Sequence, residues 1–142
     1  MVVPGVLAGD EVELPADLDA PHSWSYTRDV ARTLLAVGGR DDTWGRAWHV
    51  PSTSELPVRE LAARLAATAG APAPLLRRMT PERLAALAAE DAVVAEFPEM
   101  AYLDDRELRL DASETERLLG VSATALEVVL RELIPLPARS DM

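Results

Sequence analysis

Apart from carboxylates, side chains that commonly act as a base, a nucleophile or a metal ligand are scarce in this sequence. It has two histidines, His22 and His49, two tyrosines, Tyr26 and Tyr102, and neither cysteine nor lysine. Without thiols and lysine amines, disulfides, thiolate metal sites and lysine-based catalysis are excluded. Chemistry here depends on imidazole and phenol groups, on carboxylates, and on arginine, which supplies all 14 basic side chains.

The densest group of these residues is the stretch 22–27, with the sequence HSWSYT. Small or polar residues alternate there with aromatic ones, a pattern typical of an extended segment. In such a segment Trp24 and Tyr26 point to the same side. They either wall a substrate pocket or pack in the core, where the Tyr26 hydroxyl would need a partner. His22 taken alone suits a loop histidine that hydrogen-bonds to backbone.

No metal site and no catalytic pair is predicted. His22 and His49 would need carboxylates from distant segments to hold a metal, and His49 lies on an apolar stretch that suits a core histidine. Tyr102 is followed four residues later by Arg106, but the two aspartates between them oppose ionisation of the phenol. We therefore expect no catalytic and no metal-binding residue in this chain.

The charge balance is acidic, with 24 Asp and Glu against 14 Arg and a formal net charge of −10. Because like charges repel, binding to a nucleic-acid backbone is not expected. No apolar run approaches the roughly 18 residues of a membrane helix, and the apolar N-terminus lacks the basic region of a signal peptide. We expect a cytoplasmic protein with neither nucleic acid nor membrane as a partner.

Hydrophobic periodicity predicts the elements that must position these side chains. Helices are expected at residues 1–8, 28–37, 57–69, 81–97, 113–119 and 125–134. Short strands are expected at 11–14, 47–50 and 108–110, and 75–76 is a further strand candidate.

The second of these helices has the clearest internal pattern. Thr27 or Ser25 is expected to cap it, and Asp29 to place a carboxylate at its positive end. Its buried face is predicted to consist of Val30, Ala31, Leu34, Leu35 and Val37. Capping boxes are predicted at residues 111–114 and 124–127.

Together these patterns predict an α-rich α/β fold with short strands and about five helices. Apolar residues make up 49% of the chain, enough for a buried core. Two or three short strands rarely form a stable sheet alone, so the chain is expected to be part of a larger fold.

Three stretches resemble one known family. They are HSWSYTRDVART from His22, WGRAWHVPSTSELPVRELAARLAATAG from Trp44, and LRLDASETERLLGVSATALEVVLREL from Leu108. In this order and spacing they resemble the C-terminal half of the NAD(P)-dependent epimerase/dehydratase group of extended short-chain dehydrogenase/reductases. The resemblance implies an incomplete Rossmann-like fold over residues 1–136, the substrate-binding portion, and a flexible tail at 137–142.

The resemblance also assigns binding roles. His22 matches the position where a basic side chain meets a substrate phosphate or polar group, although the family's arginine would bind phosphate better than a neutral imidazole. Tyr26 matches an aromatic residue or histidine between the two halves of the fold, and Trp24 lies beside it. Tyr102 falls where the family places residues that close over the substrate.

The family's coenzyme motifs are missing from the 142 residues. There is no glycine-rich turn between a strand and a helix, and no Tyr-x-x-x-Lys. NAD or NADP is therefore implied for an intact family enzyme but is not expected to bind this chain alone. The implied function is the substrate-binding portion of an epimerase, dehydratase or reductase acting on a sugar-like or other small carbonyl or alcohol substrate.

The alternative is a non-catalytic helical module for protein–protein interaction. It would use its amphipathic helices to bind a partner through exposed apolar surface. If the chain is instead a truncated enzyme, the same surface would pack on a missing N-terminal Rossmann half or on a second copy.

Overall fold

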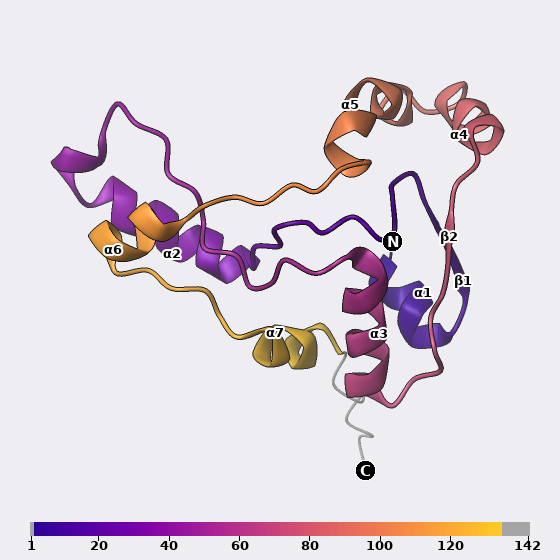
Figure 1. Ribbon diagram of the computed structural model, residues 1–142, viewed down its shortest axis with the longest axis horizontal. Coiled ribbons are helices and arrows are strands. Elements are labelled where there is room, and N and C mark those ends of the chain that lie inside the picture. The colour runs from indigo at the N-terminus through magenta and orange to yellow at the C-terminus, as the bar shows by residue number, and fades with distance from the viewer. Residues whose placement is uncertain (1, 135–142) are drawn as a thin grey trace, which may run out of the picture.

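The computed structural model describes residues 2–134, so the predicted tail at 137–142 lies outside the described residues. Within that range the chain is an α-rich α/β fold, as predicted (Figure 1). Its α-helices are α1 (Val2–Ala8), α2 (Thr27–Gly38), α3 (Val58–Ala69), α4 (Pro81–Ala88), α5 (Phe97–Asp104), α6 (Ser113–Leu119) and α7 (Leu126–Leu133). The strands are β1 (Glu11–Leu14) and β2 (Leu75–Arg78), and 3-10 turns lie at Asp41–Thr43 and Val94–Glu96.

The core lies where α1, α3 and α7 meet, beside the two strands (Figure 1). Its buried members are Val6, Ala62, Leu65, Ala66, Leu126 and Leu130. On α3 and on α7 these residues share one face of the helix, because residues three or four apart project from one side. This cluster is the main hydrophobic contribution to the stability of the described chain.

The sheet consists of β1 and β2, which pair in parallel with Glu11 opposite Leu75. The strand candidate at 75–76 is therefore confirmed. Helix α1 precedes β1 and ends at Gly9, whose φ of 77° suits glycine. Gly5 lets α1 approach the sheet, because a Cβ at that position would lie 2.6 Å from Cγ2 of Val12.

Helix α2 forms where it was predicted but presents the wrong face to the protein. Its buried side chains are Asp29 and Thr33, whereas Leu34 is 66% and Leu35 77% exposed. The cause is its neighbour: α2 packs on α6 at the end of the molecule away from α1 and α3 (Figure 1). The apolar stripe that Ala31, Leu34 and Leu35 form on α2 therefore faces outward.

Two predicted strands and one predicted helix end are wrong. Residues 47–50 and 108–110 form no strand, because a strand needs a hydrogen-bonded neighbour. Within the described chain these two segments make only one isolated bridge, between Leu108 and His22. Pro98 does not end the fourth helix: α4 stops at Ala88, and Pro98 lies in the first turn of α5, where its missing N–H costs nothing.

The predicted caps are wrong at α2 and α7 and correct in part at α6, where the Asp111 carboxylate accepts from the backbone N–H of Ser113 at 2.9 Å. Thr80 caps α4 by accepting from the backbone N–H of Arg83 at 3.2 Å. The N-cap residues of α2, α6 and α7 are Tyr26, Ala112 and Ala125, and none of them makes a side-chain cap bond.

Within residues 2–134, no helix combines the length and the apolar character needed to cross a bilayer.

Candidate functional site

The stretch around Trp24 is extended, as predicted, and is held by backbone hydrogen bonds to two distant segments. Trp24 N–H donates to the Ser54 carbonyl at 2.9 Å, and Thr53 N–H donates to the Trp24 carbonyl at 2.7 Å. On the other side, Ser23 N–H donates to the Leu108 carbonyl at 2.9 Å. These bonds fix the aromatic stretch between the loop before α3 and the loop before α6.

The polar atoms of His22 and Trp24 bind backbone. Nε2 of His22 lies 2.7 Å from the Arg106 carbonyl, which can only accept, so this nitrogen carries the proton. Nε1 of Trp24 donates to the Leu56 carbonyl at 2.8 Å. The two rings lie 6.3 Å apart, tilted by 53°. Backbone thus fixes both rings, and Nδ1 of His22 is left as an acceptor.

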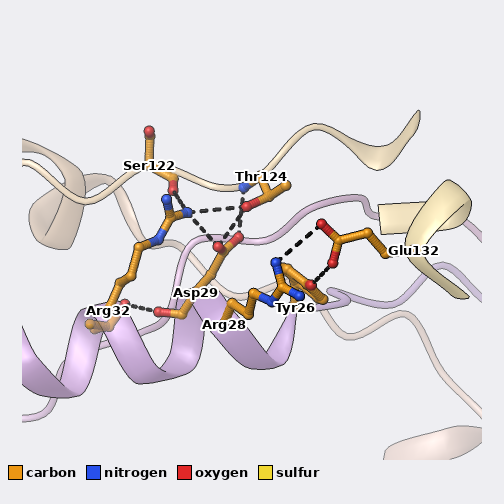
Figure 2. A network of polar contacts seen from close by, with 8 residues as sticks. Tyr26, Arg28, Asp29, Arg32, Ser122, Thr124 and Glu132 are labelled. Carbon is orange, nitrogen blue, oxygen red and sulfur yellow. Dashed lines mark hydrogen bonds and ion pairs between the residues drawn. The ribbon is translucent and has the colours of Figure 1, made fainter. Parts of the chain in front are cut away.

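Tyr26 connects the start of α2 to α7. Its hydroxyl donates to the Glu132 carboxylate, which also accepts from Arg28 at 3.2 Å (Figure 2). The guanidinium carbon of Arg28 lies 5.8 Å from the centre of the Tyr26 ring. The hydrogen bond to Glu132 raises the pKa of Tyr26 above its ordinary value, so the phenol stays protonated and is not a base.

A cavity of about 240 Å³ opens beside these rings. Trp24 and Tyr26 line it with residues from the loop before α3, from α3 and from α7: Thr53, Leu61, Val129 and Leu133. Neither His22 nor Tyr102 is among its lining residues. Tyr102 lies on α5 and is 63% exposed, so the described chain brings together only part of the predicted site.

The contribution of the loop before α3 was not predicted from the sequence. Within residues 2–134 the side-chain oxygens of Ser52, Thr53 and Ser54 are buried without a hydrogen-bond partner. A buried hydroxyl left unpaired costs about 1–3 kcal/mol. Three consecutive hydroxyl residues after a proline were the only signal in the sequence.

A second, polar cavity of about 450 Å³ lies on the other side of this loop, between Ser52 and Ser113. Three of its charged side chains are engaged: Arg109 donates to Glu55 at 3.0 Å, and Asp111 accepts from the backbone of Ser113 at 2.9 Å. His49 lies nearby with Nδ1 3.0 Å from the Asp111 carbonyl. His49 is exposed, so the expectation of a core histidine is wrong.

Asp29 is the most buried charged residue of the site region, with none of its surface exposed. Its carboxylate accepts from the backbone N–H and the hydroxyl of Thr124, at 2.6 and 2.7 Å, and pairs with Arg32 (Figure 2). Arg32 also donates to the Ser122 carbonyl at 3.1 Å. Asp29 therefore ties α2 to the segment before α7, which goes beyond its predicted role as a helix-start charge.

The pH dependence of stability should report this network. Burial raises the pKa of Asp29, but the Thr124 hydrogen bonds and the charge of Arg32 outweigh it, so the net pKa lies below the usual 3.8. A pKa lower in the folded state stabilises the fold above the unfolded-state pKa, and that gain is lost as pH falls through the folded one. In urea melts, the stability gap between wild type and Asp29→Asn should be constant from pH 7 to 5 and narrow below about pH 4. A gap that does not change with pH would contradict this account.

Within residues 2–134, no three side chains from His, Asp and Glu come close enough together to hold a metal ion.

Comparisons with known proteins support the fold. No family profile matches the chain, and no curated protein matches its sequence. Among solved structures, the fold resembles that of a nucleoside-diphosphate-sugar epimerase from Staphylococcus aureus, with a TM-score of 0.63 at 18% identity. The match covers 91% of this chain and 46% of that one, so this chain spans about half the length of its structural neighbour.

Proposed function

We propose that this chain is the substrate-binding portion of an NAD(P)-dependent epimerase, dehydratase or reductase. The likeness to about half of a sugar-nucleotide epimerase supports this proposal. The observation that carries it is the outward apolar face of α2, because a soluble helix normally turns such a face toward a core. In this proposal the missing core is a coenzyme-binding half, which docks on that face.

The surroundings of α2 fit a docking surface. Trp44, 75% exposed, continues the stripe of Leu34 and Leu35, and a shallow cavity of about 330 Å³ lies between Leu34 and Trp44. Residues 47–50, predicted as a strand, run on from this surface without a strand partner in the described chain. Contiguous exposed apolar surface of this kind marks an interaction site.

The described residues do not fit a dinucleotide. A pyrophosphate site needs glycines between a strand and a helix N-terminus, where backbone N–H groups point at the phosphates. Here Gly9 lies between α1 and β1, and Gly70 and Gly120 follow the C-terminal ends of α3 and α6. We derive no hydride-transfer step from this chain, and its role in the proposed enzyme is to hold and orient the substrate.

Within that role, Trp24 and Tyr26 wall the substrate cavity. His22 does not line it, so its Nδ1 would meet a polar group only of a substrate that extends beyond the cavity. Tyr102 lies outside the cavity and would reach the substrate only after a movement of α5.

Calorimetric titration with NAD⁺ and NADP⁺ tests the proposal. We expect no heat of binding for either dinucleotide up to millimolar concentration, because no phosphate-binding turn is present. Micromolar affinity for either one would overturn the assignment of this chain to a substrate-binding portion. A chain unfolded in the calorimeter would also bind nothing, so a cooperative thermal melt of the same sample is the control.

A further inference from the structure

The cavity beside Trp24 and Tyr26 continues toward an apolar space in the core. A second cavity of about 100 Å³ lies between α1, α3 and α7, and all its lining residues are apolar, among them Val6, Val58 and Ala62. The two cavities share three walls, Leu61, Val129 and Leu133. Leu133 lines both spaces and is 41% exposed, and a change of its rotamer would join them.

The polar side chains all line the cavity beside Trp24 and Tyr26, whereas the inner cavity has only apolar walls. Ser25 and Thr27 are exposed there, the Tyr26 hydroxyl is engaged by Glu132, and the Thr53 hydroxyl is buried without a partner within residues 2–134. An apolar cavity of this kind stays dry and accepts hydrocarbon. A ligand that fits both ends has an oxygen at the rim and a hydrocarbon portion inside.

The charges around the rim determine which polar head group the ligand can carry. Arg28 and Glu132 at the rim neutralise each other, and Nε2 of His22 is held by backbone. The chain as a whole carries a formal charge of −10, which repels a nucleoside diphosphate. Among residues 2–134, the side chains at the rim named here therefore offer no unpaired positive group of the kind that binds phosphate.

From this arrangement we infer that the joined cavities bind a neutral, monofunctional aliphatic alcohol or carbonyl compound, with its oxygen at Ser25 and Thr27 and its alkyl chain between α3 and α7. The inference rests on the proposed function, since it names the substrate class of that same site. This substrate class differs from a sugar nucleotide, which is the substrate that the structural neighbour's name indicates.

Titration of the ¹⁵N-labelled full chain with small alcohols, followed by NMR, tests this inference. 1-Hexanol should give saturable shifts confined to residues around Leu61, Val129 and Leu133. From 1-propanol to 1-hexanol, each added methylene should tighten binding about fourfold. 1,6-Hexanediol should bind roughly tenfold or more weakly than 1-hexanol, because its second hydroxyl enters an apolar cavity. UDP-glucose should give no saturable shifts.

Matched variants distinguish binding at this site from nonspecific hydrophobic binding. Val58→Phe fills the inner cavity from its half-buried edge and should weaken 1-hexanol binding about tenfold. Val128→Phe, the same change at an exposed position of α7 outside the lining, should leave binding unchanged. If Val58→Phe does not fold, Leu133→Phe at the exposed wall gives the same test.

Unsaturable shifts, equal loss in both valine variants, or tighter binding of UDP-glucose would overturn the inference. These outcomes are separate from the coenzyme titration, because alcohol binding requires no dinucleotide. Coenzyme binding with intact 1-hexanol binding would refute the proposed function alone, whereas absent alcohol binding with no coenzyme binding would refute the substrate class alone.

Discussion

Replacing Asp29 with asparagine is expected to lower the free energy of unfolding by about 2–4 kcal/mol. The carboxylate is fully buried, and each of its hydrogen bonds comes from a group that would remain in place. The amide nitrogen would face either the Thr124 N–H or the Arg32 guanidinium, which can only donate, and Arg32 would lose its counter-charge. Urea denaturation at pH 7 measures the loss, with the midpoint and the slope both recorded.

Asp42→Asn is the matched control for this substitution. Asp42 also pairs with an arginine, Arg40, at 2.7 Å, but both side chains are exposed. Its loss should cost about 1 kcal/mol or less, because water screens surface ion pairs. Equal losses in the free energy of unfolding for the two substitutions would contradict the conclusion that Asp29 holds α2 to the segment before α7.

Leu130→Ala should destabilise the chain by about 2–5 kcal/mol, because it leaves a cavity in the cluster shared by α1, α3 and α7. Leu130 is 3% exposed. The same change at Leu35, 77% exposed on α2, should cost about 0.5 kcal/mol or less. Thermal melts of the pair check both values. A large loss at Leu35 would show that the apolar face of α2 is covered in solution, by a second copy or by a rearranged chain.

Local signals in the sequence were sufficient to predict much of the helical structure. Pro81 with Thr80 marks the start of α4, and Gly70 and Gly120, in the left-handed conformation, mark the ends of α3 and α6. Such signals act within one turn of helix, so a single sequence contains all that they require. The core face of α3 follows from the same short-range spacing.

The packing of α2 could not be predicted in the same way. Periodicity identifies an apolar face but not its neighbour, and here the buried face is defined by Thr124, which is 95 residues from Asp29 along the chain. The segment 47–50 was misjudged for a related reason, because strand propensity gives no strand without a partner.

The site was predicted in part. The alternation of aromatic residues placed Trp24 and Tyr26 on one cavity, since it depends only on extended backbone. The opposite walls, Leu61 on α3 and Val129 on α7, come from segments far away in the sequence, and only the folded chain brings them to the same place.

The parallel pairing of β1 with β2 has a consequence for synthesis of the chain. Glu11 pairs with Leu75, which is synthesised about 60 residues later. At about 5–20 residues per second, β1 therefore emerges from the ribosome roughly 3–12 s before β2 has been made. Throughout that interval the strand edge is bare and Val12 has no neighbour across it. Expression at lower temperature, which slows self-association of such nascent chains, should therefore raise the soluble yield.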